Sequence, residues 1–169
     1  EDRDDWRELP VITIDPHDAK DFDDAISVQK TKDGWQLAVH IADVSHYVKP
    51  GTALDKEARE RGNSTYMADR VLPMIPRELS NHLCSLMPKV DRLTQCCLMK
   101  VSNDGKIRSA RFTRAIIHSA RRFTYEEAQD ILMAPVEAAS NRFPDEDPAI
   151  VDMLHESWNL ASLLRKKRF

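Results

Sequence analysis

Two Asp-Gly pairs, each between runs of strand-forming residues, are the feature that most constrains how this chain folds. Asp33-Gly34 separates residues 25–29 from 35–42, and Asp104-Gly105 separates 94–101 from 107–119. Asp-Gly favours the tight turn that joins neighbouring antiparallel strands. Because two such hairpins occur in one chain, the sequence predicts a sheet that is largely antiparallel.

Helix-start signals alternate with these hairpins. Thr52 and Thr124 each stand three residues before an acidic residue, which is the spacing of a capping box. Asp147-Pro148 supplies an N-cap and a first-turn proline. Helices are therefore predicted over 54–61, from Thr124 to about Met133, and from Pro148 onward, with a shorter helix over 79–86. The predicted fold class is α+β, with a mixed, largely antiparallel sheet, hairpins and flanking helices.

The helix that follows Pro148 is predicted to be long and amphipathic, so it must bury one face. The segment 71–76 contains two prolines, which exclude it from the centre of a sheet. The predicted apolar face of the long helix comprises Ile150, Leu154, Trp158, Ala161 and Leu164.

Length and composition indicate one ordinary globular domain. The chain has 169 residues, of which 41% are hydrophobic and 31% charged. No apolar run approaches the ~20 residues of a membrane helix, and no signal peptide is visible. The three cysteines show no zinc spacing, and their odd number argues against a disulfide framework, so we expect a reducing cytoplasm. The net charge of −3 does not indicate a nucleic-acid-binding protein.

An acidic segment, residues 15–24, contains five aspartates between the apolar runs 11–14 and 25–28. The flanking runs predict strands, so the aspartates lie on a connection that is held at both ends. Crowded carboxylates raise one another's pKa unless a cation neutralises them. Mg²⁺ is the expected cation, with Mn²⁺ as an alternative, because hard divalent ions prefer oxygen ligands. A solvated acidic loop is the competing interpretation.

Other charged residues carry less information. The second arm of the second hairpin is interpreted as carrying Arg108, Arg111, Arg114, Arg121 and Arg122. Arg108 and Arg114 face the opposite side of that predicted strand from Arg111, so these arginines do not form one basic stripe. Solvated strand charges are favoured over RNA contacts. His40 and His46 are interpreted as structural residues and not as ligands or proton carriers.

Several motifs occur in one order along the chain: Thr13–Asp15, Asp21–Asp24, Ala38–Ser45, Arg61–Tyr66, Val71–Pro76, Leu79–Leu86 and Asp91–Leu93. In these motifs the chain resembles the ribonuclease II / ribonuclease R family of exoribonucleases, and it is closer to the ribonuclease R branch. The resemblance covers about residues 10–125. The shared order makes it more specific than any single motif.

The resemblance implies the N-terminal part of an RNB catalytic domain over residues 1–169, without a cold-shock or S1 domain. It implies metal-dependent, processive 3′-to-5′ hydrolysis of single-stranded RNA to nucleoside 5′-monophosphates. By the same resemblance, Asp15, Asp21, Asp23 and Asp24 hold the metal ions and serve catalysis, and Tyr66 stacks on the RNA 3′ end. Asp18 has no counterpart in the family pattern and is expected to face solvent.

The family's late catalytic arginine lies beyond residue 169, so we expect the isolated chain to be catalytically incomplete. Its expected partners are RNA, the rest of the catalytic domain and oligonucleotide-binding domains, with no membrane. A non-catalytic fragment or relative that only binds RNA or a partner protein remains an alternative. A calcium-binding EF-hand is disfavoured, because the acidic loop lacks the glycine that turns such a loop sharply.

Overall fold

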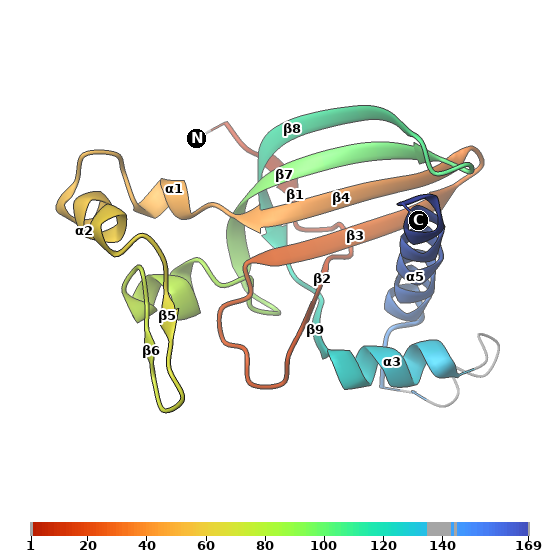
Figure 1. The fold of residues 1–169 in the computed structure, drawn as a ribbon. Coiled ribbons are helices and arrows are strands. Elements are labelled where there is room, and N and C mark those ends of the chain that lie inside the picture. Colours follow the sequence, from red (N-terminus) through yellow and green to blue (C-terminus); the bar gives the residue numbers. More distant parts are fainter. Residues whose placement is uncertain (1, 135–142, 144, 169) are drawn as a thin grey trace.

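The computed structural model describes residues 2–134, 143 and 145–168, and its elements form one large sheet with helices at its ends and on one face (Figure 1). The elements, in chain order, are β1 (Asp4–Trp6), β2 (Ile12–Asp15), β3 (Asp24–Thr31), β4 (Gly34–Ala42), α1 (Val44–Tyr47), α2 (Ala53–Arg61), β5 (Thr65–Tyr66), β6 (Val71–Leu72), η1 (Leu79–Leu83), β7 (Asp91–Ser102), β8 (Ile107–His118), β9 (Arg121–Thr124), α3 (Tyr125–Met133) and α5 (Pro148–Arg168).

The large sheet has seven strands in the order β1-β8-β7-β4-β3-β2-β9. Both predicted hairpins are confirmed, because β3 pairs with β4 and β7 with β8, each antiparallel. The two edge pairs are parallel: β1 lies beside β8, and β2 beside β9. The sheet is therefore mixed and largely antiparallel, as the sequence predicts.

Gly34 shows why the first hairpin needs a glycine. Its φ is +146°, and a Cβ atom there would lie 2.0 Å from the carbonyl oxygen of Val101 on β7. No side chain fits in that space, because real Cβ atoms do not approach backbone this closely. The turn therefore lies directly against the neighbouring strand.

The predicted helix starts are confirmed. The Thr52 side chain accepts a hydrogen bond from the Asp55 amide, and Thr124 and Glu127 form a complete capping box. The Ala149 amide donates to the Asp147 carboxylate at the start of α5. Each cap satisfies a backbone N–H group that has no partner inside its helix.

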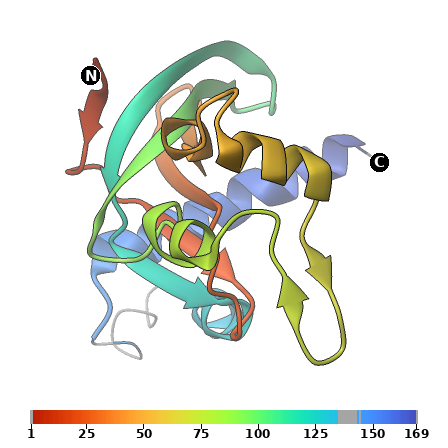
Figure 2. The same cartoon turned by 90° about the vertical axis from the view of Figure 1, so that its left-hand side faces the viewer.

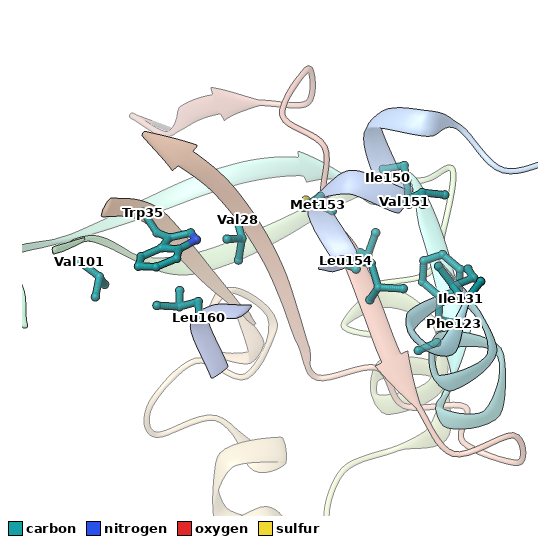
Figure 3. Close-up of a cluster of buried hydrophobic side chains, with 13 residues drawn as sticks. Val28, Trp35, Val101, Phe123, Ile131, Ile150, Val151, Met153, Leu154 and Leu160 are labelled. Atoms are coloured by element: carbon teal, nitrogen blue, oxygen red, sulfur yellow. The ribbon is translucent and has the colours of Figure 1, made fainter. Parts of the chain in front are cut away.

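Helix α5 packs against the sheet and α3 (Figure 3). It buries Ile150, Val151, Met153, Leu154 and Leu160, and not all of the face predicted from its periodicity. Trp158 of that predicted face remains 52% exposed. The core against which α5 packs is lined by Ile12, Val28, Trp35, Val101, Phe123, Ala128, Ile131 and Ala134.

Two local predictions differ from the structure. The second arm of the second hairpin ends at His118, so Arg121 and Arg122 belong to a separate strand, β9. The helix predicted over 79–86 is a five-residue π-helix that ends at Leu83. The exclusion of 71–76 from the centre of the sheet is confirmed, because Val71 and Leu72 pair with β5 in a two-stranded ribbon outside the large sheet. The ribbon and α2 extend away from the sheet on one side (Figure 2).

Among the helices of the described part of the chain, none is long and apolar enough to cross a membrane.

Candidate active site

The acidic segment is fixed at both ends by the large sheet. Asp15 is the last residue of β2 and pairs with Thr124 of β9, and Asp24 is the first residue of β3 and pairs with Ile41 of β4. Residues 16–23 form the connection between them, as predicted. Two of the aspartates thus have backbone positions set by strands, and the other three lie on the loop.

The loop is also held in its middle, by the segment that follows η1. Ser85 Oγ accepts a 3.0 Å hydrogen bond from the Phe22 amide and donates a 3.0 Å bond to the Lys20 carbonyl. The Leu86 amide donates to the Phe22 carbonyl at 2.8 Å, and the Phe22 side chain is buried. Because Phe22 stands between Asp21 and Asp23, these contacts fix the backbone that carries both aspartates.

Arg122 of β9 holds the first part of the loop. Its guanidinium donates to the carbonyl oxygens of Pro16 at 2.6 Å and His17 at 3.1 Å, and it lies 5.4 Å from the centre of the Phe22 ring. Sequence reasoning placed Arg122 on a solvated strand and missed this role. Predicting this role would have required knowing that one strand ends at His118 and another begins at Arg121. No local sequence signal indicates that break.

Replacing Arg122 with Met should lower the free energy of unfolding by about 1.5–3 kcal/mol, the usual contribution of hydrogen bonds from a charged donor. Urea unfolding followed by circular dichroism measures this. Arg108→Met is the matched control: Arg108 is exposed, with its nearest carboxylate 3.6 Å away, and we expect it to change stability by less than about 0.5 kcal/mol. Equal effects of the two substitutions would contradict the role assigned to Arg122.

The four aspartates predicted as ligands influence one another electrostatically. Burial raises the pKa of Asp15, and the nearby carboxylates of Asp24 and Asp21 add to this effect. Burial likewise raises the pKa of Asp23, and repulsion from Asp21, Asp24 and Asp15 contributes. Asp18 does not contribute to either shift. The carboxylates of Asp21 and Asp24 therefore lie close enough to both Asp15 and Asp23 to contribute to their raised pKa values.

The donor chemistry of this group suits a hard divalent cation. All four groups are carboxylates, and Asp15 Oδ2 is buried without a hydrogen-bond partner in the described part of the chain. A buried carboxylate oxygen in that state gains from a cation. Within residues 2–134, 143 and 145–168, however, no three His, Cys, Asp or Glu side chains converge closely enough to hold a metal ion as they stand. A bound ion would therefore require rotation of these short side chains.

A cavity of about 440 Å³ lies beside the acidic loop. Asp21 contributes to its wall, and so does Tyr66 of β5, whose side chain is 70% exposed. The aromatic ring is therefore accessible to a ligand and is not a core residue. The complete lining is Pro16, Asp18, Ala19, Lys20, Asp21, Ser64, Tyr66, Val71, Pro73, Arg77, Ser80 and Asn81.

The cavity unites some of the predicted site residues and adds others. Asp21 and Tyr66 share it, whereas Asp15, Asp23 and Asp24 lie outside its lining. Lys20 and Arg77 are cationic members that sequence reasoning did not select. Lys20 directly precedes Asp21, and Arg77 directly follows Pro76. Their positions beside matching motifs could have marked them as candidates.

His40 is structural, as interpreted from the sequence. It is fully buried with its ring edge-on to Trp6, and burial lowers its pKa to about 4. It is therefore neutral at pH 7. His46 lies near Arg3, which forms a buried ion pair with Asp43.

Comparisons with known proteins agree with the geometry. The RNB domain family model matches residues 3–169. Ribonuclease R of Vibrio parahaemolyticus is 47% identical over 165 residues, which are 97% of this chain and 19% of the relative. Ribonuclease R of Escherichia coli is 46% identical over 165 residues, which are 97% of this chain and 20% of the relative. The chain thus spans about a fifth of the length of these relatives.

Solved structures show the same fold. Mycoplasma genitalium ribonuclease R in complex with ribose-methylated single-stranded RNA superposes with a TM-score of 0.84 at 32% identity, covering 98% of this chain and 25% of that protein. A yeast pseudonuclease superposes with a TM-score of 0.69 at 18% identity, covering 83% of this chain and 19% of that protein, which shows the fold alone. Because the family model covers nearly the whole sequence, the chain belongs to the RNB domain family.

Proposed function

We propose that this chain carries the metal-binding part of the active site of a processive 3′-to-5′ exoribonuclease that hydrolyses single-stranded RNA to nucleoside 5′-monophosphates. The observation that carries the proposal is the loop held by Ser85 and Arg122, which brings Asp15, Asp21, Asp23 and Asp24 into one electrostatic group. Relatives 46–47% identical are ribonucleases R, and a solved neighbour binds single-stranded RNA.

The proposed cofactor is Mg²⁺, with Mn²⁺ as a substitute. We assign Asp15, Asp21 and Asp24 as direct ligands, with Asp23 helping to hold a second ion. When bound, the metal pair supplies an activated water and stabilises charge on the phosphate and the leaving oxygen. The chain itself supplies a fixed backbone for the ligands. Phe22 lies between Asp21 and Asp23, and both its backbone N–H and its backbone C=O form hydrogen bonds.

The cavity beside the loop is the proposed place for the RNA 3′ end. Tyr66 offers an exposed aromatic face there, and base stacking on such a face tolerates any base. Lys20 and Arg77 place positive charge along the same wall, where a phosphate group would be neutralised. Asp21 lines this wall too, so Asp21 would contact a metal ion while lying beside the RNA 3′ end.

The proposed partners are single-stranded RNA and the parts of the relatives that lie outside the matched fifth, including oligonucleotide-binding domains. The proposed location is the cytoplasm, and Cys84, Cys96 and Cys97 are free thiols.

The function is tested by replacing the matching 165 residues of Escherichia coli ribonuclease R with this chain. We expect the chimaera to shorten a 5′-labelled single-stranded RNA from its 3′ end in magnesium, and to leave it intact with excess chelator. The unmodified enzyme is the positive control. A folded chimaera, verified by circular dichroism, that shows no hydrolysis in magnesium would support the alternative of a non-catalytic RNA- or partner-binding protein.

Replacing Tyr66 with Ala in the same chimaera should weaken its hold on the RNA 3′ end by about 1–3 kcal/mol, the contribution of one stacked base. The size of the final product should change, because short products are released earlier. A denaturing gel of the product ladder measures this, and manganese binding should stay unchanged.

Tyr66→Phe is the matched control, because it keeps the ring and removes only the hydroxyl group. We expect its product ladder to match that of the unsubstituted chimaera. An unchanged ladder for Tyr66→Ala would return Tyr66 to a structural role.

A further inference from the structure

The ends of the two hairpins and the end of α5 meet at one end of the large sheet (Figure 1). The Asn103 amide donates to the Asp33 carbonyl at 3.1 Å, and the Asn103 side chain donates to the Lys32 carbonyl at 3.3 Å. A Cβ atom on Gly105 would lie 3.2 Å from Leu163 Cγ. The two turns and the last turns of α5 therefore form one packed surface.

This surface, which we call the basic end, is formed by segments 30–36, 100–108 and 163–168 and has strong positive charge. Its basic side chains are all exposed. The acidic side chains within these three segments are Asp33 and Asp104. The whole chain has a net charge of −3, so its charge is distributed very unevenly. The basic end consists of Lys30, Lys32, Lys100, Lys106, Arg108, Arg165, Lys166, Lys167 and Arg168.

Local ion pairs cancel little of this charge. Asp104 lies 3.2 Å from Lys106 and 3.6 Å from Arg108. One carboxylate is therefore shared by two positively charged side chains and neutralises at most one of them. Lys30 contacts Asn103 Oδ1 and the Trp35 ring, whose Nε1 donates to the Glu156 carboxylate, so Lys30 has one acidic side chain nearby. The remaining cations project from a rigid scaffold of strands and a helix end, which lowers the entropy lost when a polyanion binds.

The basic end is separate from the acidic site. Asp24 begins β3 and Thr31 ends it, which places the two about 23 Å apart at a strand rise of ~3.3 Å per residue. The aspartates and the basic end thus occupy opposite ends of the same strands. Positive charge at one end of these strands would attract a phosphate backbone to that end of the sheet.

We propose that the basic end is a second RNA-binding surface, which contacts the phosphate backbone of single-stranded RNA independently of base sequence and of metal. The inference rests on the proposed function, because RNA is the proposed substrate. Phosphate contacts of this kind supply affinity without specificity, and they weaken steeply with salt.

The test is a titration of the 169-residue chain into a 3′-fluorescein-labelled 20-nucleotide RNA, followed by anisotropy at several salt concentrations. The variant is Lys32→Gln/Lys100→Gln/Lys166→Gln. The control, Lys49→Gln/Lys56→Gln/Lys89→Gln, changes the net charge equally with exposed lysines outside the basic end. EDTA is present throughout, so the aspartate site holds no metal and no RNA is cut. Matching urea-unfolding midpoints establish that both proteins are folded.

We expect the basic-end variant to bind about tenfold more weakly, with a salt slope smaller by about 2, since each lost phosphate contact removes ~0.7. The control should bind within twofold of the wild type. Equal loss by both variants would reduce the effect to net charge and overturn the proposal. Unchanged RNA binding with lost binding to phosphatidylserine vesicles would assign the surface to a membrane instead. Neither result touches the metal proposal, because that is measured without RNA.

Discussion

Replacing Asp24 with Asn should weaken manganese binding to this chain at least tenfold. The substitution removes one negative charge and one anionic ligand from a group in which Asp15 and Asp23 already have raised pKa values. Isothermal titration calorimetry on the wild type and the variant measures the difference. In the chimaera, the same change should lower the rate of hydrolysis by ~10²–10³, the usual cost of removing one preorganised charge-stabilising group.

Asp18→Asn is the matched control, because it makes the same chemical change in the same loop. Asp18 is exposed and does not contribute to the pKa shifts of Asp15 and Asp23. We expect manganese to bind this variant nearly as tightly as the wild type. Equal manganese binding by Asp24→Asn and the wild type would mean that Asp24 is not a ligand.

The isolated 169-residue chain should hydrolyse RNA at least ~10²-fold more slowly than a complete ribonuclease R. The chain spans about a fifth of such relatives, so groups elsewhere in those relatives that stabilise charge on the phosphate would not be supplied by it. Walls that position the RNA would be missing as well, and imprecise positioning is costly in rate.

The measurement compares this chain, the chimaera and Escherichia coli ribonuclease R at equal concentration with magnesium and a 5′-labelled RNA. We expect the chimaera to restore the rate, which would show that the aspartates are functional and only their surroundings are incomplete. Comparable rates from the isolated chain and the complete enzyme would show that the chemistry is contained in these residues.

Much of the fold was predictable because its signals are local. Each Asp-Gly turn and each helix cap depends on residues within a few positions of one another, as at Thr124 and Glu127. The parallel edge strands were not predictable in this way. β1 and β9 are three and four residues long, and their partners lie more than 100 residues away.

The candidate site, too, was predictable where its signals are local and not where its contacts are long-range in sequence. The acidic segment and its fixed ends could be read from charge and from the flanking strands. The roles of Arg122 and Ser85 could not, because their hydrogen bonds to the loop span 106 and 65 positions along the chain. Helical periodicity placed Trp158 on the apolar face of α5, but periodicity alone does not tell how much of that face this chain covers itself.

The contact between Arg122 and the acidic loop has a consequence for biosynthesis. Ribosomes add ~5–20 residues per second, so roughly 5–20 s separate the synthesis of Pro16 from that of Arg122, 106 positions later. During that interval the five aspartates of residues 15–24 are already part of the nascent polypeptide, but β9 does not exist to hold them. The acidic loop therefore acquires its Arg122 contacts only after strands β2 to β8 have been synthesised.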